Sequence, residues 1–514
     1  MDAAERTGAA ALVAVLFLAA TLAGQPLSHD DLFLHLAAGE HMLTAGTVLT
    51  TDPFSYTRTG ARWVTHEWGF SVLVAIGERL GGLASLVAVR VVLVVTFFAL
   101  VAAAAWRRAG AARRGASPVL ALLLGLAAWA GSPELILRAA LAGAVLFAAA
   151  FVLLGRFREA PTLARGAALA ALFLVWANLH SGVVFGLFLV ALGALEALVL
   201  PPSPTALRTR LTSAVPHLAL ALGAGAAALL NPNGFDALAY PFRLARLLSD
   251  PASGFTVGHF AGGWHGRSAL LGLLLAVLLA GLLAARRRGG RLPPPWEVAA
   301  ALVLGALSWR TGRVALELVA VAVPTSFALW APAVRPQNGP APARPRRGLT
   351  AAGVVLVLGA LLVSAAVVAA RPPGVIAPHF PAGAAAFLER EVLPHATGTD
   401  RVRLFHHQNW GGYLHWRLGV PVFWDGRNDV FAPLVREVVD TPFTVLVERY
   451  GIDVLLLSPR EVRDLLPLLR GPRWALVYLD GRSAAFLRRD VWGERAAELA
   501  LPPRSASGPG ARLR

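Results

Sequence analysis

The chain has 514 residues, of which 56% are hydrophobic and 15% are charged, and a soluble protein could not bury so much apolar surface. Its net charge of +17 does not indicate nucleic-acid binding, because the arginines lie in short loops between apolar runs, as they do in membrane proteins. The absence of cysteine excludes disulfides, thiolate zinc sites and cysteine nucleophiles.

Apolar runs near the ~20 residues needed to cross a bilayer recur along the chain as far as residue 370. We expect eleven spanning helices, at residues 8–26, 85–106, 117–131, 134–155, 166–179, 181–200, 213–230, 268–285, 296–309, 313–334 and 349–370. With these spans, arginine-rich loops such as 107–115 lie on the opposite side of the membrane from the segment that follows the first apolar run. If those loops are cytoplasmic, the N-terminus is inside, and residues 27–84, residues 231–267 and everything after 370 are outside.

This pattern predicts a polytopic α-helical membrane protein with a C-terminal extracytoplasmic α/β domain. The composition, rich in alanine and with arginine as the only strongly basic residue, is typical of a GC-rich bacterial genome, so we expect the bacterial inner (cytoplasmic) membrane. The expected parts are a transmembrane domain (1–334) with large outer loops at 27–84 and 231–267, a Pro-rich cytoplasmic connector with the last transmembrane helix (335–370), the outer domain (371–501) and a disordered tail (502–514).

The outer domain shows alternating short apolar runs and helical patterns, which favours an α/β fold. RVRLFHH, VPVFWDGR, IDVLLLS and WALVYLD predict buried strands, and FPAGAAAFLEREVL, FAPLVREVVDTPFTVLVERYG and REVRDLLPLLR predict helices.

The first outer loop combines acids and histidines next to the membrane. Residues 31–43 predict an apolar helix along the outer membrane surface, with Asp31 and His35 four residues apart and hence on one face. GARWVTHEWG then leads back into the membrane with His66 and Glu67 at the interface. A carboxylate held there is poorly solvated, so it can serve as a general base or an electrostatic anchor, or it can simply cap a helix. For Asp52, before Pro53, we favour a role in satisfying loop backbone.

The order of an acid after the first helix, then HLAAGE, then DPFSYTRTGARWVTHEW, resembles the first large outer loop of the GT-C superfamily of membrane glycosyltransferases. More narrowly, it is similar to bacterial family 39-like sugar transferases over about the first 330 residues. The resemblance implies that Asp31, with Asp30 its immediate rival, is the catalytic base or the organising carboxylate. It also makes Glu67 a catalytic candidate, although Trp68 and Gly69 follow where the family has two prolines.

Sugar transfer from a polyprenyl phosphate needs cations or hydrogen-bond donors where charge develops on the departing phosphate. Arginine suits that task, and a charged group within a spanning segment is a functional candidate by default. Our topology places Arg138, one turn into the fourth spanning helix, near the outer face with Arg310 and Arg313. We expect these three to bind substrate phosphate, with lipid-headgroup anchoring as the alternative, which suits Arg246 beside Arg243.

Further polar residues fall on the same side of the membrane. In WANLHSG, Asn178 and His180 interrupt an apolar stretch, and together with His35 and His66 they are candidates for substrate binding. The alternative for WANLHSG is a helix–helix turn whose polar groups satisfy each other. The segment NPNGFDALAY predicts a turn and an interfacial helix that Asp236 caps. His259 and His265 show no metal-ligand spacing, although an acidic pair could hold a divalent metal ion, so the cofactor is left open.

In the outer domain, WGGY (410–413) and DGR (425–427) are similar to the C-terminal domain of the same bacterial proteins. Their glycines indicate tight turns or a close backbone approach. The surrounding aromatic, histidine and aspartate side chains fit either a sugar-binding surface or a core.

These observations favour an inverting glycosyltransferase that moves a sugar from a polyprenyl-phosphate donor to a lipid or glycan acceptor of the cell envelope. Its partners would be the donor, the acceptor and membrane lipids, without nucleic acid. One alternative is a transport or assembly protein for lipid-linked saccharides, which would use the arginines but would not need Asp31. Another is a scaffold whose outer domain binds glycan. The lack of paired repeats argues against a transporter.

Overall fold

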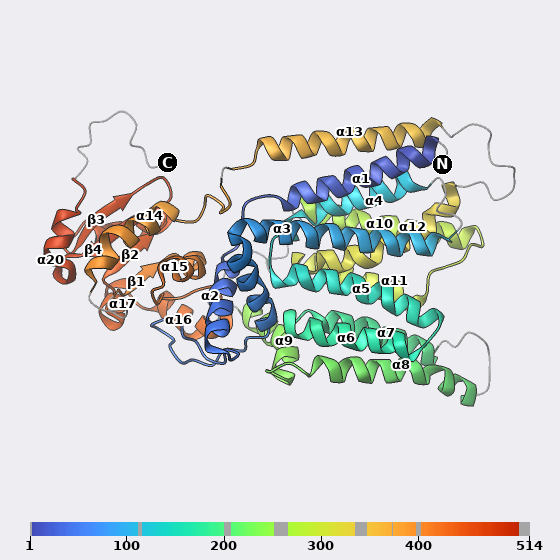
Figure 1. The fold of residues 1–514 in the computed structure, drawn as a ribbon, viewed down its shortest axis with the longest axis horizontal. Helices are drawn as coiled ribbons and strands as arrows, with labels where there is room; N and C mark the ends of the chain where they lie inside the picture. The colour runs from blue at the N-terminus through green and yellow to red at the C-terminus, as the bar shows by residue number, and fades with distance from the viewer. Residues whose placement is uncertain are drawn as a thin grey trace.

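A computed structural model describes residues 3–110, 116–199, 207–250, 266–334, 347–372, 374–396 and 402–502. In this part of the chain, long helices lie side by side in one bundle, and a smaller α/β domain lies against one end of it (Figure 1). The N-terminus lies at the opposite end of the bundle (Figure 1). We call this α/β domain the outer domain, the end of the bundle beside it the outer end and the opposite end the inner end, after the expected topology, which itself remains a prediction.

Each of the eleven expected spanning segments coincides with a helix in the described residues. The helices are α1 (Ala3–Ala23), α3 (Trp68–Ala109), α4 (Ser117–Ala130), α5 (Ala139–Glu159), α6 (Leu163–Leu179), α7 (Val183–Val199), α8 (Leu207–Ala228), α10 (Gly266–Arg287), α11 (Pro295–Arg310), α12 (Ala315–Val334) and α13 (Arg347–Ala369). By length and composition, five helices of the described residues could cross a membrane unaided, in α1, α3, α5, α12 and α13. That the other six helices also cross the membrane remains a prediction.

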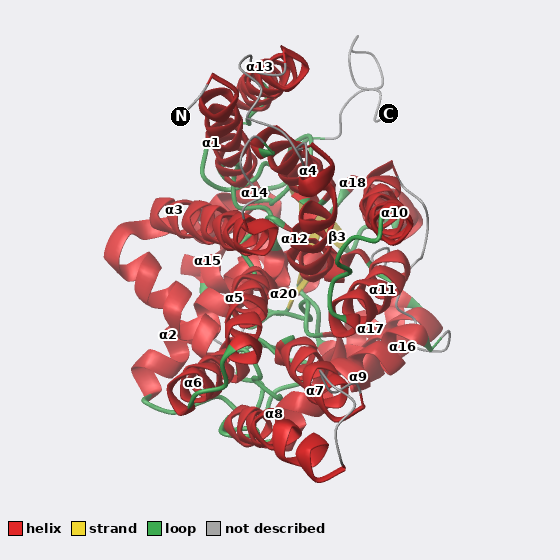
Figure 2. Ribbon diagram, turned by 90° about the vertical axis from the view of Figure 1, so that its right-hand side faces the viewer, coloured by secondary structure: helices red, strands yellow, loops and turns green. Residues whose placement is uncertain are grey.

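Helix α12 forms the centre of the bundle, surrounded by α3, α4, α5, α10 and α11 (Figure 2). All of its residues from Leu316 to Phe327 are buried, and many are alanine and valine. Small side chains let neighbouring helices approach closely, which is how helices pack where lipid surrounds them.

Helix α2 (Asp30–Ala45) and the start of α3 run across the outer end of the bundle, and α9 (Phe235–Ser249) lies at the same end (Figure 1). These are the helices expected at 31–43 and after NPNG. The α3 chain leaves helical geometry at Gly81 and Gly82, which separates its crosswise start from its spanning part. At Gly39 a Cβ would lie 2.0 Å from the carbonyl oxygen of Ser71, so only glycine lets α2 and α3 cross this closely.

The outer domain holds a four-stranded sheet in the order β1-β2-β4-β3. Strands β1 (Leu404–His406) and β2 (Val454–Leu457) are parallel, while β4 (Ala484–Arg488) pairs antiparallel with both β2 and β3 (Trp474–Leu479). The helices around it are α14 (Ala382–Phe387), α15 (Gly411–Leu418), α16 (Asn428–Asp440), α17 (Phe443–Tyr450), α18 (Pro459–Asp464), α19 (Leu466–Leu469) and α20 (Arg489–Glu498). The α/β fold was expected, but two of its strands were not as predicted.

VPVFWDGR is not a strand: only Val422 bridges to neighbouring backbone, on one side to Leu404 and on the other to Ser55. Pro421, directly before Val422, has no N–H to donate to a strand ladder, which limits backbone pairing in this segment. Strand β4 was not predicted, because its two alanines and its terminal arginine give a weak strand pattern.

Backbone hydrogen bonds join the outer domain to the first outer loop. The Val422 N–H donates to the Phe54 carbonyl at 3.0 Å, and the Tyr56 N–H donates to the Val422 carbonyl at 3.1 Å. At the entrance to the domain, the Leu27 N–H donates to the Val375 carbonyl at 2.7 Å. The outer domain is therefore fixed over the outer end of the bundle, and the two enclose the candidate site.

Candidate active site

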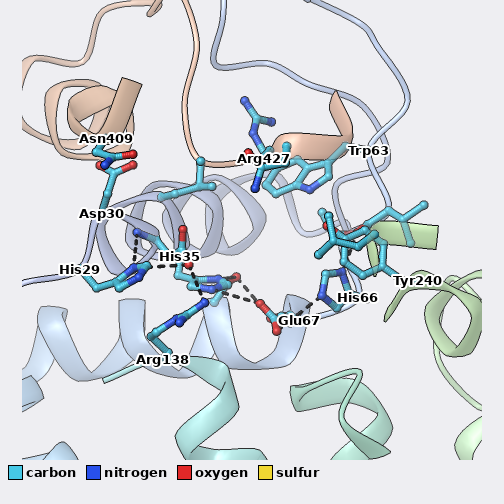
Figure 3. Close-up of a pocket in the computed structure, with 18 of the residues that line it drawn as sticks. His29, Asp30, His35, Trp63, His66, Glu67, Arg138, Tyr240, Asn409 and Arg427 are labelled. Carbon is cyan, nitrogen blue, oxygen red and sulfur yellow. Dashed lines mark hydrogen bonds and ion pairs between the residues drawn. The ribbon is translucent and has the colours of Figure 1, made fainter. Parts of the chain in front are cut away.

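A cavity of about 640 Å³ lies between the outer end of the bundle and the outer domain (Figure 3). Its walls come from α2, the start of α3, α9, the residues before α5 and α12, and outer-domain turns at 408–409 and 426–428. Seven of the ten predicted site residues line it: Asp30, Asp31, His35, His66, Glu67, Arg138 and Arg313. The structure thus gathers most of the candidates from three distant parts of the sequence.

Asp31 is paired with cations in this cavity. Its Oδ2 lies 3.2 Å from Nη2 of Arg138 and 3.4 Å from Nδ1 of His29. Burial alone would raise the pKa of Asp31, but His29 and Arg138 hold it below its usual value. Asp31 is therefore ionised at neutral pH and can accept a proton or a hydrogen bond.

Arg138 reaches Asp31 from a position that differs from the prediction. It precedes α5 in an extended conformation and does not lie one turn inside the helix. The segment before it forms a 3₁₀ turn (Ser132–Glu134) containing Pro133, and this turn delays the helix until Ala139. The extended backbone directs the guanidinium toward α2 (Figure 3).

Asp30 points away from Arg138 and toward the outer-domain residue Asn409 (Figure 3). It is buried, and its Oδ1 accepts the backbone N–H of Tyr413 at 3.0 Å, near the start of α15. A Cβ on Gly412 would lie 2.8 Å from the Asp30 carbonyl oxygen, so the glycine of WGGY permits the close approach that the sequence predicted. Burial, followed by the neighbouring Asp31 charge, raises the pKa of Asp30 well above its usual value.

Glu67 is surrounded by three histidines. Its Oε2 lies 3.3 Å from Nε2 of His35, and its Oε1 lies 3.5 Å and 3.6 Å from Nε2 of His66 and His180. Nδ1 of His35 in turn lies 2.8 Å from Oγ of Ser71 on α3. With both oxygens engaged, Glu67 is suited to hold imidazoles in place rather than to act as a free base.

The charges of this group follow from its contacts. Burial alone would raise the pKa of Glu67, but His66 and the hydrogen bonds from the imidazoles hold it well below its usual value. Burial alone would lower the pKa of His66, which the Glu67 carboxylate instead raises. Burial lowers the pKa of His180 to about 4, so His180 is neutral and supports Glu67 from outside the cavity lining. The His66 ring also stacks on Tyr240, with ring centroids 3.8 Å apart (Figure 3).

Besides His180, two predicted residues lie outside the cavity lining. Oδ1 of Asn178 accepts the indole N–H of Trp68 at 2.8 Å, and its amide donates to the Leu230 carbonyl at 3.1 Å. These bonds join α6 to α3 and to the end of α8, as in the helix–helix turn considered above. Arg310 is exposed at the end of α11, whereas Arg313, three residues later, lines the cavity.

The remaining candidates are placed as follows. Arg243 and Arg246 line a separate groove on α9 with Phe242, and Arg243 pairs with Asp236 at 2.7 Å. Asp236, in the first turn of α9, also pairs with Arg62. The predictions for His259, His265, the connector at 335–346 and nearly all of the tail lie outside the described residues.

An ion cluster clamps the outer domain to the first outer loop. Nη2 of Arg427 lies 2.6 Å from Oδ2 of Asp425 and 2.8 Å from Oδ1 of Asp52, and all three side chains are buried. The guanidinium also lies over the Trp63 ring, 4.4 Å from its centroid. Asp52 accepts the Phe54 N–H at 2.9 Å, which confirms its predicted role in satisfying loop backbone.

Sequence reasoning missed part of the cavity wall: His29, Trp63, Tyr240, His379, Gln408, Asn409 and Asn428. WGGY and DGR did mark the two outer-domain turns that reach the site. Tyr240 carried no such signal, because its ring acquires a partner only when α9 folds against His66.

A metal ion finds no ligand set in the described residues, where no three histidine, cysteine, aspartate or glutamate side chains are grouped to hold one. Asp31 and Glu67 instead contact histidines and Arg138. A divalent ion held by an acidic pair therefore stays a prediction.

Comparison with known proteins rests on structure, since no family model and no curated protein matches the sequence. ArnT from Cupriavidus metallidurans in the apo state superposes with a TM-score of 0.57 at 17% identity, covering 96% of this chain and 98% of that chain. The same protein bound to undecaprenyl phosphate gives a TM-score of 0.53 at 15% identity, with the same coverage.

The oligosaccharyltransferase AglB from Archaeoglobus fulgidus, in complex with an inhibitory peptide and a dolichol-phosphate, gives a TM-score of 0.55 at 12% identity. That match covers 88% of this chain and 69% of AglB. A further structure of the A. fulgidus enzyme contains Zn and sulfate, with a TM-score of 0.54 at 12% identity and coverage of 92% of this chain and 73% of that chain. The likenesses show that this chain shares the overall fold of ArnT and AglB.

Proposed function

We propose that this protein is an inverting glycosyltransferase that moves a sugar from a polyprenyl-phosphate donor to a lipid or glycan acceptor of the cell envelope. The reaction would take place on the outer face of a bacterial inner membrane. The observation that carries the proposal is one cavity, at the outer end of the bundle, lined by an ionised aspartate paired with Arg138 and by a second arginine, Arg313.

The cavity suits the head of such a donor. Its volume of about 640 Å³ is within the range of small-molecule sites, while a polyprenyl chain would remain in lipid beside the bundle. Two proteins of the same fold were solved with dolichol-phosphate and undecaprenyl phosphate, which supports a lipid phosphate as the ligand.

The chemistry needs a group that takes a proton and groups that stabilise a leaving phosphate. The acceptor hydroxyl or amine would attack the anomeric carbon of the sugar as its proton passes to Asp31. The bond between that carbon and the phosphate oxygen breaks, and both electrons leave with the polyprenyl phosphate. Arg313 and Arg138 line the same cavity and would stabilise the added charge. Attack opposite the leaving phosphate inverts the anomeric configuration.

Glu67 would act indirectly. Its contacts with His35 and His66 fix two imidazoles that line the cavity beside Asp31. Such imidazoles could donate hydrogen bonds to sugar or acceptor hydroxyls, and Tyr240 would keep the His66 ring in its plane.

The experiment compares the wild type with Asp31→Asn and Asp440→Asn in nanodiscs. Asp440 is an exposed acid at the end of α16, away from the cavity lining, and serves as the matched control. One assay measures binding of a polyprenyl-phosphate sugar, and the other measures release of polyprenyl phosphate with a cell-envelope extract as the acceptor source.

All three proteins should bind the donor, and Asp31→Asn should lose turnover by ~10²-fold or more. Equal turnover in Asp31→Asn would contradict its role as the base. If every protein bound the donor and the wild type released nothing with any extract, the reading as a transport or assembly protein would replace this one.

A further inference from the structure

The two adjacent aspartates at the start of α2 have opposite surroundings. Asp31 contacts Arg138 and His29. Asp30 has no ion pair within the described residues, and its side chain is buried, with 8% of the residue exposed. Its Oδ1 accepts the Tyr413 N–H, whereas its Oδ2 is buried and has no hydrogen-bond partner in that part of the chain.

The charges that face Asp30 are negative from both sides. Asp31 is next to it on α2, and Asp425 approaches from the turn before α16 in the outer domain. The cations around them are already paired, Arg138 with Asp31 and Arg427 with Asp425 and Asp52. A buried carboxylate without a cation is unstable as an anion and takes up a proton instead.

The outer domain closes directly on this carboxyl group. A Cβ on Gly426 would lie 2.9 Å from Oδ1 of Asp31 and 3.7 Å from Oδ2 of Asp30, so the DGR turn covers the unpartnered oxygen. A negative charge at that oxygen would repel Asp31 and Asp425 and compete for Arg138. A neutral carboxyl group there lets the turn and α15 approach.

We propose that Asp30 is a positioning residue that carries a proton at neutral pH, so that Asp31 is the only anion of the pair. As a neutral acid, Asp30 still accepts the Tyr413 N–H and holds α15 against α2. It also does not compete with Asp31 for the Arg138 guanidinium. The consequence for catalysis rests on the proposed function, but the protonation itself can be tested without any turnover.

Thermal melting of the full-length protein in nanodiscs, between about pH 4 and about pH 8, provides that test. A group whose pKa is raised by folding stabilises the folded protein when it is protonated. This stability is lost as the pH rises from the pKa of the group in the unfolded chain, about 4 for aspartate, through its pKa in the folded protein. Asp30→Asn is a neutral isostere and lacks this loss. Its melting temperature relative to the wild type should therefore increase as the pH rises.

Asp31→Asn is the matched control, for which no such increase is expected. Because folding lowers the pKa of Asp31, the stability that Asp31 contributes is lost only as the pH falls below the unfolded pKa of about 4, and it is nearly constant above it. The melting temperature of Asp31→Asn relative to the wild type should therefore stay nearly level between about pH 5 and about pH 8. An Asp30→Asn variant whose relative melting temperature also stayed level over that interval would overturn the proposal.

Asp30→Ser, a smaller neutral acceptor for the Tyr413 N–H, is the second variant. Failure of both neutral variants to fold would equally overturn the proposal, since it requires that an uncharged group is accepted at this position. Turnover does not enter this test, because Asp30 lines the candidate active site. Absence of turnover in the wild type would count against the proposed function and leave the melting result intact.

Discussion

The two ends of the helix bundle both bury arginines and carboxylates, but they arrange them differently. At the end away from the outer domain, Arg158 pairs with Glu196 and Arg108 pairs with Glu297. At the outer end, Asp31 and Arg138 lie 3.2 Å apart and line a cavity of about 640 Å³.

The inner pairs are satisfied by the protein itself. Glu196 also accepts the Trp296 N–H at 2.7 Å, and the Arg108 guanidinium lies 4.5 Å from the centre of the Phe151 ring. These contacts join α3, α5, α7 and α11. Charges that are fully paired and packed hold a fold together, whereas charges that surround an open volume are available to a ligand. The comparison therefore distinguishes arginines that stabilise the fold from arginines that we propose bind a ligand.

The largest expected effect on stability is at the inner end. Glu297→Ala removes a buried carboxylate and leaves Arg108, whose side chain is 19% exposed, without its partner. This change should cost about 3 kcal/mol of unfolding free energy, the lower end of the range for buried pairs. Turnover per folded molecule should stay unchanged, because the pair is remote from the cavity. Thermal melting and turnover, measured on the same preparation, check both statements.

The double variant Arg108→Met with Glu297→Leu is the control for that prediction. Replacing both charges by apolar groups should recover most of the lost stability. A loss of turnover without a loss of stability in Glu297→Ala would contradict the distinction between the two ends.

At the outer end, the expected effect is on binding. Arg313→Gln removes a cation from the cavity and should weaken binding of a polyprenyl phosphate by about 1.5–3 kcal/mol, the usual worth of a charged hydrogen bond. Arg310→Gln is the matched control, because Arg310 lies three residues earlier and outside the cavity lining. Titration of both variants in nanodiscs measures the difference, and equal affinities would exclude Arg313 from the phosphate site.

The smallest expected effect is at an exposed pair on the crosswise helices. Arg79 donates to both oxygens of Glu40, at 2.8 Å and 2.6 Å, but both side chains are about half exposed. Glu40→Gln should change the unfolding free energy by less than about 1 kcal/mol, as exposed ion pairs generally do. Thermal melting measures this change. A loss of unfolding free energy as large as that in Glu297→Ala would show that burial does not determine how much these ion pairs stabilise the protein.

The sequence predicted the parts of the site that local chemistry determines. Asp31 and His35 were recognised because their spacing places them on one helical face, and Arg138 and Arg313 because charge is costly next to lipid. The eleven predicted spans matched helices because apolar length is a strong signal. By contrast, the predicted position of Arg138 inside a helix was wrong, because Pro133 and the 3₁₀ turn delay the start of α5 until Ala139.

The rest depends on contacts between distant segments. Nothing local indicates that Tyr240 stacks on His66, or that the N–H of Tyr413 meets Asp30 across more than 380 positions of the chain. The bond from Tyr413 gives Asp30 surroundings that differ from those of Asp31, although the two residues are adjacent in sequence. Tertiary structure, and not residue type, separates their roles.

The most direct test of the account is an experimental structure in nanodiscs with a polyprenyl phosphate bound. We expect the phosphate to lie in the outer cavity, within hydrogen-bonding distance of Arg313 or Arg138 and beside Asp31. A phosphate seated instead on the α9 groove near Arg243 and Arg246, with the cavity unoccupied, would contradict the claim that the charges around the cavity bind the donor.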